Sequence, residues 1–600
     1  AIRQKGSPGD RAAFFFGFPY ILGNRAARCP ALPVTPPNPA IVSQKAVQAL
    51  PRWALLLLCL AYVVPGFVGR DPWKSADVTA FGYMLELAQG TTSWWNPLLG
   101  GMAPETDGLL PYWLGALAIQ WAPAGLTPDM AARLPFAGML VLTLIATWYG
   151  VYYLARSPAA QPVAFAFGGE AQPTDYARAM ADGGLLALLA CLGLAQLSHE
   201  ATSYLVQLCC TTLVFFGFAA LGFHTVAPAL ALAAGLAGLT LAGAPALAAM
   251  LGLGGAWLVW RSASVDIAHQ RRWVAATLIL VAAAALMAWQ LDLWRWRLVG
   301  TDAGGKEWAS LARLLLWFGW PAWPLAIWTL WRWRKQIAST QWHRHLWLPL
   351  WFSLVSVGAT ISTAPADRAL LLGLPAMATL AAFALPTLSR AVAALIDWFT
   401  LLFFSISTLA IWVIWIAMQT GVPAKPAANV AKLAPGFSPS FSLFALLVAL
   451  AASVAWCSLV WWRASRDRAP IWKSLVLPAS GATLGWLLLL TLWLPLLNYA
   501  RSYAPQVQNV VRLMNNAPKG CVQTYGLSRG QIAAFQYHGG MNLQAADPQG
   551  RCDWLLVDLN AWPAPPGIAK TSDWAEVAIV PRPTDKNDQL VLLRRAQAPQ

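Results

Sequence analysis

Charged residues are scarce in this sequence. Only 11% of its 600 residues are Asp, Glu, Lys or Arg, against roughly 25% in a soluble globular protein. Such a chain lacks the polar surface needed to face water on all sides. Hydrophobic residues account for 58%, and uncharged apolar runs of about 18 residues or more recur along most of the length. These runs predict helices, because unpaired backbone groups are too costly in lipid. The composition therefore excludes an ordinary soluble protein and predicts a polytopic membrane protein.

Motifs for metal binding are also missing. The sequence has eight cysteines but no CxxC pair and no Cys/His cluster, so it predicts no structural metal site. Most of the cysteines lie in apolar runs. Cys521 and Cys552 fall together in the C-terminal region, where they are able to form a disulfide if that region lies outside the cytosol.

The N-terminal segment lacks the features of a cleavable signal peptide. No small-residue cleavage site follows an apolar core in residues 1–52. The segment is rich in proline, glycine and basic residues, and it predicts a disordered cytosolic tail.

Positive charge is abundant, with a formal net charge of +16. A basic chain can bind nucleic acid, but here the basic residues cluster in short loops between apolar runs rather than on one soluble face. Such clusters mark the cytosolic ends of membrane spans. We therefore predict membrane lipids as partners and no nucleic acid. Many of the 35 tryptophans lie at the ends of apolar runs, where they anchor a span at the interface.

The apolar runs predict about thirteen spans. The stretch 226–260 is too long for one helix and is divided at Gly243-Ala244-Pro245, because proline cannot comfortably continue a helix. The short segment 111–123 is expected to lie in the interface or to re-enter it. The spans are 53–69, 131–154, 184–198, 201–222, 226–242, 245–260, 273–290, 311–331, 346–363, 368–388, 396–418, 441–462 and 475–498. This odd number places the N-terminus and the basic loops in the cytosol and the C-terminus outside.

Three regions follow from this pattern. Residues 1–52 are the cytosolic tail, 53–498 the membrane domain with a long first external loop at 70–130, and 499–600 an external domain. Short alternating stretches in the last region, such as 552–557 and 589–593, are broken by proline and glycine and predict strands. A small α/β or α+β domain is therefore expected at the C-terminus.

Candidate functional residues lie outside the spans. Two features that are common in transporters are weak or missing: almost no charged residue lies inside a predicted span, and the second half of the sequence does not repeat the first. The first external loop is rich in carboxylates interleaved with tryptophan, although an acid just after a span is more often solvated than catalytic. The pair His199-Glu200 lies in a turn too short to be freely solvated. Both side chains are expected to face protein, either in a site or in a structural hydrogen bond.

Several short motifs occur in an order that is known from one group of enzymes. They are Gly69-Arg70-Asp71-Pro72-Trp73-Lys74, Trp95-Asn96-Pro97, Pro111-Tyr112-Trp113-Leu114, Ala131-Ala132-Arg133-Leu134-Pro135 and Pro321-Ala322-Trp323-Pro324. Their order and spacing resemble the GT-C glycosyltransferases, in particular the bacterial aminoarabinose (lipid A) transferases and protein O-mannosyltransferases. The resemblance covers nearly the whole chain, although each motif by itself is loose.

The resemblance implies a GT-C-like membrane domain and a glycosyltransferase of the bacterial inner membrane. A sugar would pass, with inversion, from a polyprenyl-phosphate donor to lipid A, another glycan or a protein at the periplasmic face. The catalytic acid of this family, near the start of the first external loop, corresponds to Asp71, which suits a general base. Lys74 is expected to bind the donor phosphate. The expected substrate-binding residues are Arg70, Lys74, Asp77, Glu105, Asp107, His199, Glu200, Lys306 and Arg368.

Two departures from the family pattern leave the donor headgroup and the acceptor open. The family's lysine before a double proline is absent, and Asp107 or Gly108 stands near its place. A later T-K-G-P motif appears as Leu241-Ala242-Gly243-Ala244-Pro245, without the lysine. An inactive relative or envelope scaffold is thus one alternative, and a lipid or solute transporter or flippase is another. No cofactor is assigned, and the carboxylates of the first loop leave a divalent metal open.

Overall fold

The computed structural model describes residues 38–600, apart from residues 107, 263–268, 295–304, 364–365, 465–469, 515–519, 548, 551, 564–572 and 597–600. Most of the predicted tail, residues 1–37, lies outside the described residues. The remainder of that tail is ordered, which corrects the prediction for residues 38–51. Ala40 and Val42 are buried there, and the main chain bonds to the segment 163–171.

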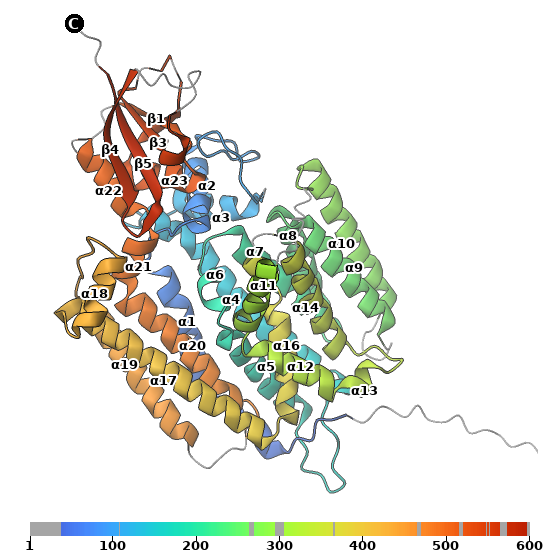
Figure 1. The fold of residues 1–600 in the computed structure, drawn as a ribbon. Helices are drawn as coiled ribbons and strands as arrows, with labels where there is room; N and C mark the ends of the chain where they lie inside the picture. The colour runs from blue at the N-terminus through green and yellow to red at the C-terminus, as the bar shows by residue number, and fades with distance from the viewer. Residues whose placement is uncertain are drawn as a thin grey trace, which may run out of the picture. The chain divides into compact units, whose positions relative to one another are not determined.

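Helices dominate the part of the chain before residue 514 (Figure 1). The first group is α1 (Arg52–Phe67), α2 (Ala76–Gln89), α3 (Leu110–Gln120), α4 (Pro128–Ala155), α5 (Pro173–Ala190), α6 (Leu194–Leu197), α7 (Ser203–Ala220), α8 (Val226–Leu241), α9 (Pro245–Arg261), α10 (Gln270–Gln290) and α11 (Gly305–Phe318). The second group is α12 (Ala322–Arg332), α13 (Arg334–Ile337), α14 (Arg344–Ser362), α15 (Ala366–Leu371), α16 (Leu374–Ala384), α17 (Arg390–Thr420), α18 (Ala424–Leu433), α19 (Leu443–Ala464), α20 (Lys473–Leu492), α21 (Leu494–Arg501) and α22 (Ala504–Leu513).

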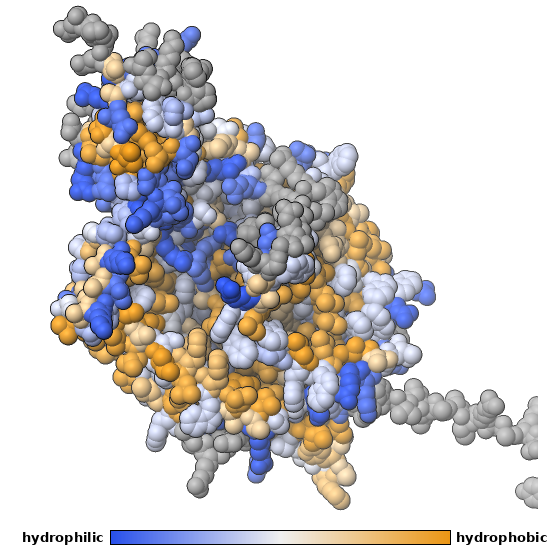
Figure 2. Space-filling model, in the orientation of Figure 1, coloured by the Kyte–Doolittle hydropathy of each residue, from blue (hydrophilic) through white to orange (hydrophobic). Residues whose placement is uncertain are grey.

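Long apolar helices make this a multi-pass membrane protein. Among the described residues, seven helices are long and apolar enough to cross a bilayer, namely α4, α7, α10, α14, α17, α19 and α20. Large apolar side chains of α17 and α19, such as Leu402, Phe444 and Leu447, are exposed. Figure 2 shows a largely hydrophobic surface over this helix pair, and hydrophilic side chains are concentrated where the C-terminal sheet meets the helices. The apolar faces are those that lipid would cover.

Helix boundaries confirm one predicted break between helices and add others. The division of 226–260 is confirmed, because α8 ends before Gly243 and Pro245 starts α9. The predicted span 311–331 is two helices, since Pro321 separates α11 from α12. Likewise, 368–388 and 475–498 are each divided into shorter helices. The segment 111–123 is the short helix α3, which at 11 residues extends only about 17 Å and cannot cross a bilayer. The number of spans stays a prediction.

Small residues let the central helix α5 approach its neighbours closely. Nearly every residue from Tyr176 to Ala190 is buried, and α5 packs against α4, α16 and α20. A Cβ atom on Gly183 would lie 2.3 Å from Leu385 Cδ1, and one on Gly184 would lie 2.7 Å from Val151 Cγ2. Small residues at such contacts allow the close van der Waals packing that holds membrane helices together.

The C-terminal domain is a five-stranded mixed sheet with α22 and α23 (Arg529–Gly539) packed against it. Its strands are β1 (Cys521–Tyr525), β2 (Asn542–Ala545), β3 (Trp554–Asp558), β4 (Trp574–Arg582) and β5 (Asp585–Arg595), in the order β2-β1-β3-β5-β4. The strands β2, β1 and β3 are parallel, whereas β5 is antiparallel to β3 and β4. Alternate residues of β5 face opposite sides of the sheet: Leu590 and Leu592 belong to the main core, and Val591 and Leu593 to a smaller cluster. A small α+β domain is therefore confirmed.

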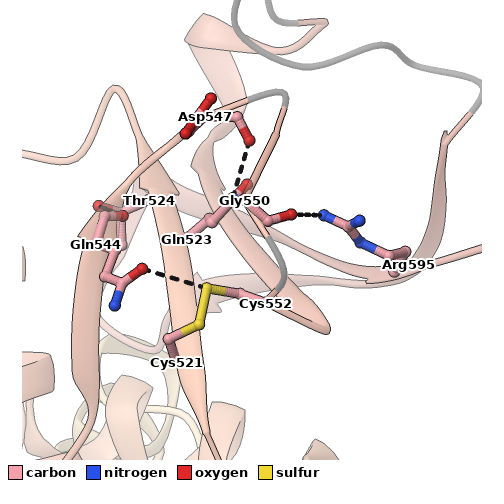
Figure 3. The surroundings of a disulfide bond; sticks show 8 residues. All are labelled: Cys521, Gln523, Thr524, Gln544, Asp547, Gly550, Cys552 and Arg595. Carbon is pink, nitrogen blue, oxygen red and sulfur yellow. Dashed lines mark hydrogen bonds between the residues drawn. A yellow bond between two sulfur atoms is a disulfide. The ribbon is translucent and has the colours of Figure 1, made fainter.

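A disulfide joins Cys521 at the start of β1 to Cys552 just before β3 (Figure 3). The bond closes a loop across two parallel neighbours, because β1 and β3 pair directly. Disulfides of this kind persist in oxidising compartments.

Loss of this disulfide is expected to destabilise the C-terminal domain by about 2–4 kcal/mol, because the open chain gains conformational freedom. The measurement is the melting temperature of the purified protein with and without reductant, compared with that of the Cys521→Ser variant. As a control, the Cys457→Ser change, at an exposed cysteine in α19, should leave the melt unaltered. Equal melting temperatures for the oxidised protein, the reduced protein and the Cys521→Ser variant would contradict the prediction.

Candidate active site

A buried ion pair fixes the turn that follows α1. Arg70 is 1% exposed, and its Nη2 donates to Asp77 Oδ2 at 2.9 Å and to the His199 carbonyl at 2.7 Å. Asp77 also accepts from the backbone N–H groups of Trp73 and Ala201, at 3.2 and 2.9 Å. Arg70 and Asp77 therefore join the segment that follows α1 to the turn at 199–201. These contacts give both candidate residues a structural role.

Asn498, in the middle of α21, also holds this turn. Its Oδ1 accepts from Trp73 Nε1 at 2.9 Å and from the Asp71 main-chain N–H at 3.2 Å, while its Nδ2 donates to the Gly69 carbonyl at 3.1 Å. One amide thus satisfies polar groups at three positions of the turn. The Trp73 ring is in addition within cation–π distance of Arg70 and Arg501.

Asp71 itself is half-buried and lines a cavity of about 620 Å³. The cavity lies between Asp71, the segment 435–438 and the helices α21 and α22. Its polar lining residues are Ser438, Asn498, Tyr499, Gln508, Asn509 and Arg512. Amides, a phenol and a guanidinium beside a carboxylate offer hydrogen bonds to a polar, hydroxylated ligand.

Two residues of the C-terminal domain, Tyr537 and His538 of α23, also lie near Asp71. The Tyr537 hydroxyl donates to Asp129 Oδ1 at 2.7 Å, and Asp129 pairs with Arg133 at 3.2 Å. Burial and the Asp129 hydrogen bond raise the pKa of Tyr537. Burial lowers the pKa of His538, whereas the nearby charges of Asp71 and Asp129 oppose this. No sequence motif pointed to these two residues, because they are more than four hundred positions away from Asp71 in the chain.

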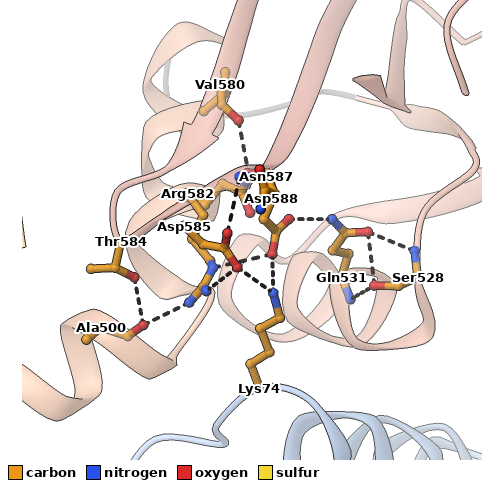
Figure 4. Close-up of polar contacts among 11 residues, drawn as sticks. Lys74, Ala500, Ser528, Gln531, Val580, Arg582, Thr584, Asp585, Asn587 and Asp588 are labelled. Carbon is orange, nitrogen blue, oxygen red and sulfur yellow. Dashed lines mark hydrogen bonds and ion pairs between the residues drawn. The ribbon is translucent and has the colours of Figure 1, made fainter. Parts of the chain in front are cut away.

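Lys74 is engaged by two carboxylates of the C-terminal domain (Figure 4). Its Nζ lies 2.9 Å from Asp588 Oδ2 and 3.2 Å from Asp585 Oδ2. Hydrogen bonds from Lys74 and Asn587 lower the pKa of Asp585 to about 2. The stabilisation from ionised Asp585 is therefore complete above its unfolded pKa of about 3.9 and is lost only as the pH falls towards 2.

The turn at 199–201 carries a second ionic contact. Glu200 lies 3.6 Å from Arg368 and accepts from Gln196 at 3.1 Å. Burial raises the pKa of the Glu200 carboxyl, and Arg368 opposes that shift. The His199 ring packs between Phe67 and Trp486, with its two nitrogens facing the carbonyls of Ala195 and Tyr62.

An apolar cavity of about 420 Å³ lies beside Arg368. The Arg368 guanidinium is 4.7 Å from the centre of the Tyr204 ring, and both Tyr204 and Ala369 line this cavity. Most of its walls come from α9 and α14, through Leu247, Met250, Trp351, Leu354 and Val355. The site thus combines an apolar cavity, a half-buried cation at its edge and a separate polar cavity at Asp71.

The two segments in which this sequence lacks the lysines of the family, at Gly108 and at Ala242, are in contact. A Cβ atom on Gly108 would lie 2.9 Å from the Ala242 carbonyl carbon, and Ala242 is itself fully buried. The Leu109 N–H donates to the Leu241 carbonyl at 2.7 Å. Close backbone packing therefore occupies the space that two long side chains would need.

Replacing Gly243 by Ala is expected to destabilise this contact by at least about 1–2 kcal/mol. Gly243 has φ +80°, and an added Cβ would lie 2.0 Å from the Thr106 carbonyl oxygen. The melting temperature of the purified variant measures the effect. Gly421→Ala is the matched control, because Gly421 has φ +78° with nothing within 4 Å of a Cβ. Equal losses for both variants would show that the contact with Thr106 contributes nothing.

The remaining candidates lie at the edge of the site or beyond the described residues. Glu105 is exposed and pairs with Arg529 of α23 at 3.1 Å. Asp107 and the side chain of Lys306 in α11 lie outside the described residues. In the part of the chain that is described, no group of three or more His, Cys, Asp or Glu side chains is arranged to hold a metal ion.

Comparison with known proteins identifies the fold. No protein-family model and no curated protein sequence matches the chain. Two crystal structures do match: ArnT from Cupriavidus metallidurans bound to undecaprenyl phosphate, with a TM-score of 0.57, and the same protein in the apo state, with a TM-score of 0.56. Each is 15% identical to this chain, and each match covers 91% of this chain and 99% of ArnT.

This chain has the ArnT fold. Since ArnT is an aminoarabinose lipid A transferase of the GT-C type, the predicted resemblance is confirmed at the level of the fold. The match extends over nearly the full length of ArnT, so it includes both the membrane helices and the C-terminal domain. At 15% identity the likeness to ArnT establishes architecture, and the roles of individual residues have to be argued from their own contacts.

Proposed function

We propose that this protein transfers a sugar from a polyprenyl-phosphate donor to an envelope acceptor at the periplasmic face of the bacterial inner membrane. The acceptor is lipid A, another glycan or a protein. The observation that carries the proposal is the placement of Asp71 on an ArnT fold. Asp71 follows the first apolar helix, and its main-chain N–H is held by Asn498 in a turn that the Arg70–Asp77 pair also stabilises. The residue lines a polar cavity.

The chemistry assigned to Asp71 is general-base catalysis. An acceptor hydroxyl oxygen attacks the anomeric carbon, and its proton passes to the Asp71 carboxylate. The bond between that carbon and the phosphate oxygen breaks, and polyprenyl phosphate leaves with the electron pair. Direct attack inverts the anomeric configuration, so a product with retained configuration would contradict this scheme. If the acceptor is a phosphate, which is already ionised, Asp71 orients it instead.

The lipid part of the donor is assigned to the apolar cavity beside Arg368. An apolar wall suits a polyprenyl chain, and a guanidinium at its edge suits the phosphate and the charge that develops on it. ArnT was crystallised with undecaprenyl phosphate, which supports a lipid of this class. Arg368 takes the role that the sequence suggested for Lys74, because Lys74 is held by two carboxylates. The turn at 199–201 contacts both Asp77, close to Asp71 in the chain, and Arg368.

The proposed orientation places the N-terminus in the cytosol and the C-terminal domain in the periplasm. The Cys521–Cys552 disulfide supports this assignment, because disulfides are rare in the cytosol. Accessibility of Cys521 and Cys552 to a membrane-impermeant thiol reagent, after reduction in intact spheroplasts, tests the orientation.

The decisive experiment supplies purified protein in lipid with a panel of polyprenyl-phosphate sugars and measures released polyprenyl phosphate. Release that depends on an added acceptor supports a transferase. Movement of the intact donor between leaflets without release would identify a flippase instead. An Arg368→Gln variant is expected to raise the KM for the donor, since the phosphate loses its cation.

A further inference from the structure

A cluster of four charged residues joins the Asp71 turn to the C-terminal domain. We infer that the C-terminal domain positions Asp71 through Lys74 and is therefore part of the catalytic site rather than a cover over it. This inference rests on the proposed function. Lys74, Arg582, Asp585 and Asp588 are together called the tether (Figure 4).

The carboxylate side of the tether is preorganised within the C-terminal domain. Asp588 on β5 is 8% exposed, accepts from Gln531 Nε2 at 2.9 Å and lies 3.3 Å from Arg582 Nε. Gln531 belongs to the capping box that starts α23, together with Ser528. Arg582 also donates to the Ala500 carbonyl at 2.8 Å. The acceptor for Lys74 is thus fixed by a sheet, a helix start and the end of α21.

Lys74 links the carboxylates of the C-terminal domain to Asp71. Lys74 is three residues after Asp71, and the intervening Pro72 and Trp73 are buried. The Lys74 main-chain N–H donates to the Arg501 carbonyl at 2.8 Å, so main chain and side chain are both held. With so few buried residues between them, a displacement of Lys74 also displaces Asp71.

Charge balance explains why the lysine is needed. Two carboxylates face two cations, Lys74 and Arg582, so the tether is neutral as long as Lys74 is present. Removal of Lys74 leaves two acids facing one guanidinium, and a net negative charge is unfavourable where Asp588 is buried. A donor phosphate at Lys74 would have to compete with both carboxylates. These contacts therefore favour a role for Lys74 in positioning Asp71 over a role in binding the donor phosphate directly.

The test measures steady-state kinetics of Lys74→Gln, Asp588→Asn and the double variant. We expect each single change to lower kcat by about 10–100-fold, because small displacements of a reacting group are costly, while the KM for the donor changes little. The double variant should be no slower than the slower single variant, since the two residues act as one unit. Lys74→Arg should keep most of the activity. Lys586→Gln, at an exposed lysine next to Asp585 in β5, is the matched control with unchanged activity.

Direct binding of the donor phosphate by Lys74 would give a different pattern. Lys74→Gln would then raise the KM for the donor, Asp588→Asn would leave kcat unchanged, and the two effects would multiply in the double variant. This pattern would overturn the inference. Thermal melts of each variant show whether the C-terminal domain is folded. If Asp588→Asn does not fold, the kinetics of Lys74→Gln alone decide between the two roles.

Hydrogen exchange separates the tether from the proposed function. Backbone amides of residues 71–78 are expected to exchange faster in Lys74→Gln and Asp588→Asn than in the wild type or in Lys586→Gln. This readout needs no substrate, so it remains informative if no donor is ever turned over. Unchanged exchange in both tether variants would overturn the inference even in an active enzyme.

Discussion

Asp71→Asn is expected to lower turnover at least about 100-fold, because an amide cannot take the proton of an acceptor hydroxyl. Asn has nearly the same shape as Asp, and the described hydrogen bond between this residue and Asn498 uses the main-chain N–H, which the change preserves. The measurement is release of polyprenyl phosphate under saturating donor and acceptor. Because the acid acts in the transition state, kcat should fall more than the KM for the donor changes.

Two controls separate catalysis from folding in this experiment. The melting temperature of Asp71→Asn should match that of the wild type. Asp175→Asn, which removes a carboxylate from the start of α5, should leave turnover unchanged. Wild-type turnover in folded Asp71→Asn would remove this residue from the mechanism.

The largest expected effect on stability belongs to Asp77→Asn, at about 3–5 kcal/mol, because it breaks a buried ion pair and leaves the Arg70 charge without its partner. Asp77 receives donors from Arg70, Trp73 and Ala201. An amide cannot satisfy all three donors, because one of its two terminal atoms is itself a donor. Denaturation of the purified protein, followed by tryptophan fluorescence, measures the loss.

A matched comparison is provided by Glu105→Gln, which breaks an ion pair that is largely exposed. Glu105 is 73% exposed where it meets Arg529, so its removal should cost no more than about 1 kcal/mol. A loss of similar size in the two variants would contradict the assignment of a buried, structural role to Asp77.

The fold class could be predicted from the sequence because several independent patterns indicate it. Long uncharged runs, basic loops and an alternating C-terminal region each constrain the architecture independently, and the ArnT fold agrees with them. Helix breaks were harder to predict. The run 311–331 contains a single charged residue, Arg313, and its hydropathy does not show the division at Pro321.

The candidate site was predictable only in part. Asp71 could be singled out because it follows the first span within a recognisable motif. The engagement of Lys74 by Asp585 and Asp588 could not be foreseen, because their pairing depends on how the C-terminal domain docks. Tyr537 and His538 were missed for the same reason. A local sequence motif is enough to single out Asp71, whereas the residues that surround it come from distant segments of the chain.

The hydrogen bonds from Asn498 have a consequence for how the molecule is made. Asn498 binds the Gly69 carbonyl, the Asp71 N–H and the Trp73 indole, which are separated from it by more than four hundred positions in the chain. Ribosomes deliver the chain from the N-terminus, so the Asp71 turn is made long before its amide partner is synthesised. The final conformation of the Asp71 turn is therefore expected to form late, after α21 has been synthesised. A nascent chain that stops before α21 carries Asp71 without the side chain that fixes it.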